Sequence, residues 1–246
     1  MPDMSDNRQF LFLVASTREA GHVGNTEWLA RQAAAALPAD TPQRWLHLAR
    51  MNLVPFTDLR HTAGQYPMPD GDMKVLLDAT LAATDIVLVA PVYWYSLPAT
   101  AKLYLDHWSA WLRIPGVPFK DTMTTKTLRL ITTSGDRAKA QPMMDSVRLC
   151  AAFFPMAWGG VKGPVLWGKG GPPGAVQADE VVHPQRVELI VLVDPQALQR
   201  REGVEAAQAA PARQQRRRQR VGRDVGVEEV ADARVVINIQ PVQLRL

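Results

Sequence analysis

The sequence predicts an α/β protein built on a doubly wound parallel β-sheet with helices on both faces. Two apolar runs, Phe10–Val14 and residues 86–90, are too short for ordinary helices and indicate strands that are buried on both sides. Segments with helical periodicity separate the apolar runs, and small or polar residues follow each run. Strands that alternate with helices in this way are typical of a parallel sheet, because the crossover helices cover its faces.

The chain begins with a predicted strand, a helix and a second strand. The run Phe10–Val14 forms the first strand and leads into a loop that contains two glycines. An alanine-rich helix follows, and Pro38 ends it because proline cannot continue the helical hydrogen bonding. Residues 44–49 are the predicted second strand. The apolar spacing predicts an inner helix face made of Leu29, Ala33, Ala36 and Leu37.

The middle of the chain contains a long loop, two helices and a strand. Residues 54–72 hold three prolines and two glycines and are therefore predicted to be a loop. Residues 73–83 form a helix, and residues 86–90 form a strand that Pro91 ends. A further helix begins beyond Pro98. Its buried stripe is Ala101, Leu105, Trp108 and Leu112.

Another strand starts at Leu128 and ends in small hydroxyl residues and a glycine, and a helix over residues 143–154 follows it. Three of the four predicted strands, at residues 10–14, at residues 86–90 and from Leu128, end in loops with ligand-binding chemistry. In open α/β sheets, ligands bind outside the carboxyl ends of the strands. The agreement of the three loops is stronger evidence than any one of them alone.

The loop after the first strand has the composition of a phosphate-binding site. Hydroxyls, a guanidinium and glycine lie beside a helix start, where unpaired backbone N–H groups and the helix dipole favour an anion. The loop lacks the Gly-Lys-Ser/Thr of nucleoside triphosphate sites and the third glycine of a dinucleotide fingerprint. A single phosphate ester fits best, and a turn that only caps the helix is the alternative. The candidate residues are Ser16, Arg18, Gly24, Asn25 and Thr26.

The loop after the strand at residues 86–90 is rich in aromatic residues. Three aromatic side chains in a row suit contact with a planar ring, and the alternative is that they cover the sheet end or form a subunit contact. The candidate residues are Pro91, Val92, Tyr93, Trp94, Tyr95 and Ser96. The loop after the strand from Leu128 adds Thr133, Ser134 and Gly135.

These motifs resemble those of the flavodoxin-like NAD(P)H-dependent FMN reductase family. The resemblance rests on Ser-x-Arg and Gly-Asn-Thr in the first loop, and on Pro-Val-Tyr-Trp-x-Ser followed by Ala-x-x-Lys-x-x-Leu-Asp in the second. It covers residues 8–180 and implies the strand order 2-1-3-4-5, bound FMN, and NAD(P)H as reductant. FMN phosphate contacts are implied for the first loop and flavin ring contacts for the other two. The implied acceptor is a small molecule: a quinone, an azo or nitro compound, or free flavin.

The resemblance implies no catalytic protein residue, because FMN carries the electron chemistry. A flavodoxin-type electron carrier is the alternative within this fold. Such carriers are usually acidic, whereas residues 1–180 hold 17 basic and 16 acidic residues, which favours the reductase. A flavin-free structural or regulatory relative would be expected if the phosphate loop binds nothing.

Composition and charge limit the remaining function classes. No apolar run approaches the ~20 residues of a membrane span, and residues 1–8 lack the features of a secretory signal, so a cytoplasmic protein is expected. The histidines show no spacing typical of metal ligands, and the single cysteine, Cys150, is expected to be a core thiol. The sequence fixes neither the nicotinamide, NADH or NADPH, nor the oligomeric state, so a homo-oligomer stays open.

The chain divides into a domain over residues 1–180 and an atypical extension over residues 181–246, rich in Arg, Val and Gln. From Lys169 onward the sequence contains no aromatic residue and no Met, so the extension is expected to be poorly ordered. Residues 187–193 and 235–239 are candidate strands and residues 196–210 a candidate helix. One hypothesis is that the extension is a recent addition or the product of a shifted reading frame. A basic cluster at residues 213–223 suggests nucleic-acid binding as a minor alternative, but no aromatic side chain is interleaved for base stacking.

Overall fold

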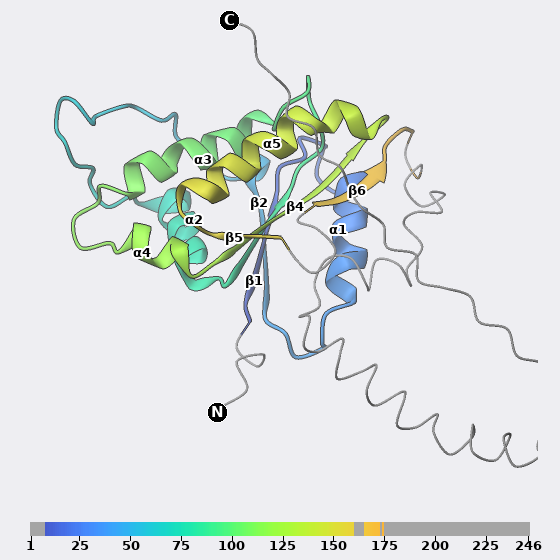
Figure 1. Cartoon of the computed structure of the whole chain (residues 1–246), viewed down its shortest axis with the longest axis horizontal. Coiled ribbons are helices and arrows are strands. Elements are labelled where there is room, and N and C mark those ends of the chain that lie inside the picture. The colour runs from blue at the N-terminus through green and yellow to red at the C-terminus, as the bar shows by residue number, and fades with distance from the viewer. Residues whose placement is uncertain (1–7, 160–164, 173, 175–246) are drawn as a thin grey trace, which may run out of the picture. The chain divides into compact units, whose positions relative to one another are not determined.

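The computed structural model describes residues 8–159, 165–172 and 174, which form a parallel sheet with helices on both faces (Figure 1). Its strands are β1 (Phe10–Val14), β2 (Gln43–His47), β3 (Asp85–Val89), β4 (Thr127–Ser134), β5 (Ala157–Trp158) and β6 (Val165–Lys169). The order along the sheet is β2-β1-β3-β4-β5, and β6 also pairs with β4. The predicted order 2-1-3-4-5 is confirmed.

Two short segments share the place of a fifth strand. β5 pairs with the start of β4 through Thr127 and Leu128. β6 pairs with the later part of β4, from Leu130 to Ser134. Both pairings are parallel, so the carboxyl end of β6 reaches the same edge of the sheet as the carboxyl end of β4. This edge carries the loops for which the sequence predicts ligand binding.

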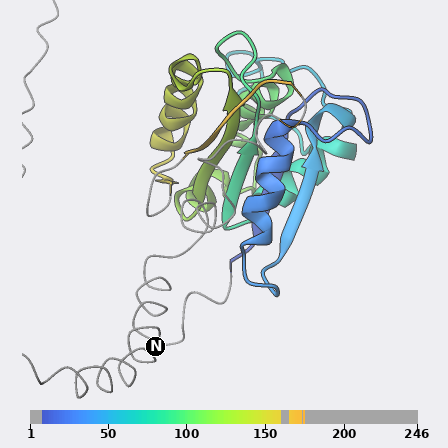
Figure 2. The same cartoon turned by 90° about the vertical axis from the view of Figure 1, so that its right-hand side faces the viewer.

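The described helices are distributed unequally over the two faces of the sheet (Figures 1 and 2). On one face α1 packs against Phe10, Phe12 and Val14 of β1. Residues from the other four helices join Leu11 and Leu13 in the core on the opposite face. These helices are α1 (Asn25–Ala35), α2 (Gly71–Ala82), α3 (Ala99–Trp111), α4 (Phe119–Thr124) and α5 (Arg137–Phe153), and Leu48–Arg50 form a 3-10 turn.

The interior strand β1 is buried because both of its faces are covered. All five of its side chains are buried, and the ring of Phe12 stacks on that of Trp45 in β2 with centroids 4.2 Å apart. Burial of each such large apolar side chain contributes roughly 1.5–3 kcal/mol. The loop that follows Val14 therefore starts from a fixed point.

Several element boundaries differ from those that the sequence predicts. The predicted start of the last helix at residue 143 is wrong: α5 begins at Arg137, because Asp136 caps it by accepting a hydrogen bond from the Ala138 backbone N–H at 2.9 Å. Pro142 lies inside the helix and does not mark its start. The 3-10 turn replaces the predicted end of the second strand. Helix α4 and strands β5 and β6 were not predicted.

Buried charges lie at the amino edge of the sheet, opposite the edge that carries the predicted ligand-binding loops. Asp85, which is 2% exposed, accepts hydrogen bonds from Arg8 and from Arg129. Lys126 is 3% exposed and donates through Nζ to the carbonyl oxygens of Leu81, at 2.8 Å, and Ala83. Burial lowers the pKa of Lys126 to about 8. The lysine thus pairs with carbonyls at the end of α2, where the helix dipole favours a positive charge.

The elements predicted at residues 187–193, 196–210 and 235–239 lie outside the described residues, as does the extension that contains them. Within the residues described, no helix has the length and hydropathy that a membrane span requires. Cys150 is partly buried and packs against the core, and burial raises the pKa of its thiol.

Candidate functional site

A cavity of about 310 Å³ lies at the carboxyl edge of the sheet and brings together all three loops that the sequence singles out. Its volume is at the lower end of the ~300–1,000 Å³ range of ligand pockets. It is lined by Ser16, Arg18, Gly24, Asn25, Thr26, Pro91, Tyr93, Thr133, Ser134, Gly135, Gly170 and Gly171. Four of the predicted site residues, Val92, Trp94, Tyr95 and Ser96, do not line it.

The start of α1 forms one end of the cavity and has the features of an anion site. Gly24 is the N-cap, and no side chain caps the helix, so its first backbone N–H groups are available to a ligand. The side chain of Arg18 lies over Gly24: a Cβ at this position would be 2.8 Å from Arg18 Nε. Glycine therefore leaves space for the guanidinium beside the helix start. Among the described residues, no carboxylate pairs with Arg18.

Hydroxyl groups add to the polarity of this end. Thr26, which is buried in the first turn of α1, hydrogen-bonds through Oγ1 to Thr133 Oγ1 of β4 at 2.5 Å. Only one of the two hydroxyl hydrogens is used in this bond, so the pair retains a donor. The Ser16 hydroxyl accepts a long bond of 3.4 Å from the Arg18 backbone N–H and keeps its own hydrogen. Hydroxyl groups from the loop after β1, from α1 and from β4 therefore meet at the helix start.

An aromatic turn occupies the loop after β3. Tyr93 and Ser96 exchange both backbone hydrogen bonds at 3.0 Å, and the φ angles of Trp94 and Tyr95 between them are 49° and 64°. Two positive φ values define a type I′ turn, which normally carries Asn or Gly, so two aromatic residues are strained there. Trp94 is 94% exposed and Tyr95 is 54% exposed. Strained backbone and exposed aromatic surface in one turn are typical of a binding loop.

The aromatic turn is tied to the first loop. Tyr93 lines the cavity, and its hydroxyl hydrogen-bonds to Thr17 Oγ1 at 3.2 Å. Val92 donates its backbone N–H to Thr133 O at 3.4 Å, which holds the start of the turn against β4. The polar and the aromatic ends of the cavity are therefore joined by hydrogen bonds.

Gly170 and Gly171, which follow β6, line the cavity and were not predicted as site residues. The Gly170 backbone N–H donates to Ser134 O at 2.7 Å, and a Cβ at Gly170 would lie 3.2 Å from the Ser134 backbone N. Glycine is needed here because the two backbones approach closely. The apolar residues of β6, which precede Gly170 and Gly171, were the feature of the sequence that could have indicated a further strand and a loop after it.

The structure assigns different tasks to two of the predicted polar residues. The Ser134 hydroxyl accepts from Trp167 Nε1 at 2.8 Å and donates to Asp136 O at 2.7 Å, so it is engaged within the protein. The Asn25 side chain is engaged with residues 171, 172 and 174. Both residues line the cavity, and the hydrogen bonds of their side chains hold neighbouring parts of its wall.

A buried acid lies close to the helix start. Glu27 is 4% exposed and pairs with Arg31 one turn later at 2.6 Å. His47, at the end of β2, lies 3.9 Å from the same carboxylate oxygen. Burial lowers the pKa of His47, although Glu27 acts in the opposite direction. At neutral pH the charge of Glu27 is therefore balanced mainly by Arg31.

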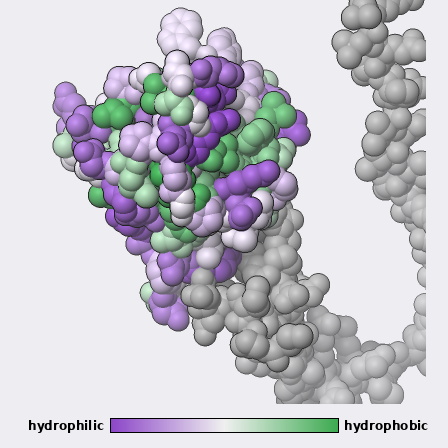
Figure 3. Space-filling view, turned by 90° about the vertical axis from the view of Figure 1, so that its left-hand side faces the viewer, coloured by the Kyte–Doolittle hydropathy of each residue, from purple (hydrophilic) through white to green (hydrophobic). Residues whose placement is uncertain are grey.

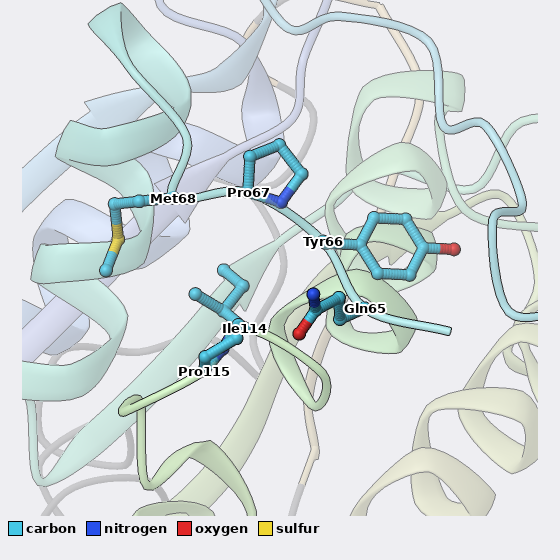
Figure 4. A pocket seen from close by; sticks show the side chains of 6 residues that line it. All are labelled: Gln65, Tyr66, Pro67, Met68, Ile114 and Pro115. Atoms are coloured by element: carbon cyan, nitrogen blue, oxygen red, sulfur yellow. The ribbon is translucent and has the colours of Figure 1, made fainter. Parts of the chain in front are cut away.

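A second cavity, of about 480 Å³, lies between the long loop and the segment after α3 (Figure 4). Figure 4 shows the Tyr66 ring turned away from Met68 and Ile114. No charged side chain lines this cavity, and none of the predicted site residues belongs to it; its lining is Gln65, Tyr66, Pro67, Met68, Ile114 and Pro115. An anionic ligand would therefore be favoured in the smaller cavity, which Arg18 and the start of α1 line.

In the space-filling view, hydrophobic and hydrophilic surface alternate on the side of the molecule that faces left in Figure 1 (Figure 3).

Comparison with known proteins agrees with this architecture. Residues 8–158 match the family model described as flavodoxin-like fold. The chain belongs to this family. A protein of Bacillus subtilis (strain 168), which carries the provisional name NAD(P)H-dependent FMN-containing oxidoreductase YwqN, is 31% identical over 159 residues, 63% of this chain and 83% of that protein. The flavodoxin-like NAD(P)H-dependent FMN reductase family that the motifs predict is confirmed by these matches.

Solved structures show the same fold. The Trp repressor binding protein from Bacillus subtilis superposes with a TM-score of 0.54 at 23% identity, covering 75% of this chain and 98% of that one. An FMN-dependent NADH-azoreductase from Bacillus anthracis str. Ames Ancestor, solved in complex with FMN, superposes with a TM-score of 0.51 at 12% identity, covering 74% and 96%. At these identities the two flavodoxin-like structures support the fold.

Proposed function

We propose that this flavodoxin-like chain is an FMN-dependent NAD(P)H oxidoreductase, which passes hydride or electrons from a nicotinamide to a small-molecule acceptor. The observation that carries the proposal is the cavity at the carboxyl edge, which joins a helix start without a side-chain cap and Arg18 at one end to an aromatic turn at the other. The names of two proteins that are similar to this chain point to the same chemistry: NAD(P)H-dependent FMN-containing oxidoreductase and FMN-dependent NADH-azoreductase.

The polar end of the cavity fits a phosphate monoester. Backbone N–H groups at the start of α1 and the Arg18 guanidinium supply charge-assisted donors, and the hydroxyls of Ser16 and Thr26 supply neutral ones. Arg18 cancels part of the dianionic charge that a phosphate brings. No Lys or Mg²⁺-binding hydroxyl motif is required for a single ester. Ser16, Arg18, Gly24, Asn25 and Thr26 are therefore proposed to hold the FMN phosphate.

The aromatic end fits a planar ring. Pro91 and Tyr93 line the cavity, and Thr133 to Gly135 form its floor. Val92, Trp94, Tyr95 and Ser96 complete the turn beside it and are proposed to contact the flavin ring. FMN, when bound, supplies the hydride and electron chemistry, and the chain binds and orients it and restricts water. The apolar rings of the turn suit planar acceptors such as quinones and azo or nitro compounds.

The proposal is tested by adding FMN to the purified protein and measuring flavin absorbance after removal of free FMN. We expect Arg18→Ala combined with Thr26→Val to weaken FMN binding by a factor of about 10 to 100, because a charge-assisted and a hydroxyl hydrogen bond are lost. Arg148→Ala, an exposed arginine on α5, is the matched control. Wild-type protein without flavin absorbance would show that the site is assigned wrongly.

A flavodoxin-type electron carrier is distinguished by its reductant. We expect NADH or NADPH to bleach the bound flavin under anaerobic conditions, and a quinone or azo dye to restore its absorbance. Bleaching by dithionite but by neither nicotinamide would favour the electron carrier. A homo-oligomeric state and a cytoplasmic location stay predictions.

A further inference from the structure

The side chain of Asn25 is occupied by a segment that lies nearly 150 residues away in the sequence. Its Nδ2 donates to the carbonyl oxygens of Gly171 and Pro172, each at 3.2 Å. Its Oδ1 accepts from the backbone N–H of Gly174 at 3.1 Å. Both functional atoms of the amide are thus engaged, although Asn25 sits at the first position of α1, where a ligand for phosphate is expected.

The segment that Asn25 holds is a wall of the cavity. Gly170 and Gly171 line the cavity, and Gly170 is fixed to the end of β4 by its bond to Ser134 O at 2.7 Å. Asn25 fixes the following residues to the start of α1. The segment is therefore clamped at two points, one on β4 and one on α1, which are themselves joined by the bond between Thr133 and Thr26.

We propose that Asn25 is a positioning residue, whose side-chain amide holds Gly171, Pro172 and Gly174 at the wall of the flavin cavity and makes no contact with the phosphate. The inference rests on the proposed function only in taking the ligand to be a flavin. Its backbone N–H stays available to the phosphate, because it is one of the uncapped donors at the helix start. The side chain of Asn25 thus holds the cavity wall, and its backbone N–H is available to the phosphate.

The assignment predicts that substitutions of Asn25 and of Arg18 change the binding of FMN and riboflavin in different ways. Asn25→Ala keeps the backbone N–H and removes three hydrogen bonds to the wall, so FMN and riboflavin are expected to bind about five- to tenfold more weakly, by the same factor. Arg18→Ala removes a phosphate contact and is expected to weaken FMN only, because riboflavin has no phosphate. Equilibrium titration of both flavins against the full-length protein and both variants measures these factors.

A second measurement needs no flavin. In the full-length protein, the Gly174 amide is bonded to Asn25 Oδ1, so its hydrogen exchange is expected to be faster in Asn25→Ala than in the wild type. Asn25→Ser, which keeps a small polar side chain but lacks the amide that bonds to both carbonyls, replaces the alanine variant if that variant does not fold. Arg148→Ala is the control for both readouts.

Equal weakening of both flavins together with faster Gly174 exchange supports the clamp. Loss of FMN affinity alone, or unchanged exchange at Gly174, overturns it. If the wild type binds neither flavin, the proposed function fails, and the exchange measurement still decides whether Asn25 holds the segment.

Discussion

Glu27 places a negative charge in the first turn of α1, beside the donors proposed for a phosphate. The carboxylate is buried, its pair with Arg31 is 2.6 Å long, and burial lowers the pKa of the nearby His47. Without Arg31 the carboxylate would compete with a bound phosphate for the positive end of the helix. The arginine therefore matters to the site although it does not line the cavity.

Arg31→Ala is expected to weaken FMN binding by about two- to fivefold, because the charge of Glu27 is no longer balanced near the helix start. The effect should be larger at low ionic strength, where charges are less screened. Adding Glu27→Gln to this variant is expected to restore the affinity. Arg44→Ala, an exposed arginine of β2, serves as the control. An equal loss in both arginine variants would contradict a local effect.

Lys126 links stability to pH at the opposite edge of the sheet. Burial lowers its pKa from an ordinary 10.5 to about 8. Between these two values the unfolded chain binds the proton more tightly than the folded chain, so this group makes the protein more stable as the pH rises. Below pH 8 both states are protonated, and the full cost of burying the charge is present.

Lys126→Met is expected to remove the contribution of Lys126 to the pH dependence of the free energy of unfolding. The test is urea unfolding of the wild type and the variant at pH 7, 8 and 9, with the difference between their free energies of unfolding as the readout. The difference should shift in favour of the wild type as the pH rises. A pH-independent difference would show that Lys126 titrates alike in the folded and unfolded chains.

The aromatic turn after β3 stores strain that a simpler turn would avoid. Its two positive φ angles suit Asn and Gly, and each L residue held there costs on the order of 1–2 kcal/mol. Trp94 and Tyr95 gain little burial in return, because they are 94% and 54% exposed. The turn is thus better explained by contact with a ligand than by its contribution to folding.

Replacing Trp94→Asn and Tyr95→Gly together is expected to stabilise the flavin-free protein by about 1–2 kcal/mol, since this pair is favoured in type I′ turns. The same variant is expected to have a raised KM for planar acceptors and a weakened affinity for FMN. Urea unfolding without flavin measures the first effect and steady-state kinetics the second. A destabilised variant would mean that the two rings support the fold.

At the scale of elements, the buried strands could be predicted and the sheet margin could not. Phe10–Val14 is apolar throughout because both its faces are covered, and this pattern has few other interpretations. β5 has only two residues, Ala157 and Trp158, which is too short for any periodic signal. The predicted start of α5 at residue 143 was too late, because Asp136 caps the helix six residues earlier and Pro142 is accommodated inside it.

At the scale of the molecule, topology explains why the site was largely predicted. Parallel strands carry their loops to one edge, so three separate motifs had to converge there, and the structure places ten of the fourteen predicted residues around one cavity. The wall at Gly170 and Gly171 was missed because the strand before it was not recognised. The engagement of Asn25 depends on this distant segment and has no local signal in the sequence.

The predicted division of the chain into residues 1–180 and 181–246 leads to an expectation about the whole molecule. All residues that line the cavity lie between Ser16 and Gly171, and residues 195–246 contain no aromatic side chain that could contact a flavin. We therefore expect a chain that ends at Asp194 to bind FMN with the affinity of the full chain.

The measurement is FMN titration of both chains, together with limited proteolysis of the full chain. Cleavage sites concentrated beyond residue 194 are expected, since the sequence there offers few groups for an independent core. A further chain that ends at residue 180 tests residues 187–193, whose apolar run is suited to packing on the domain. If ending the chain at Asp194 weakens FMN more than about tenfold, a loss of about 1.4 kcal/mol in binding free energy, the extension belongs to the flavin-binding domain.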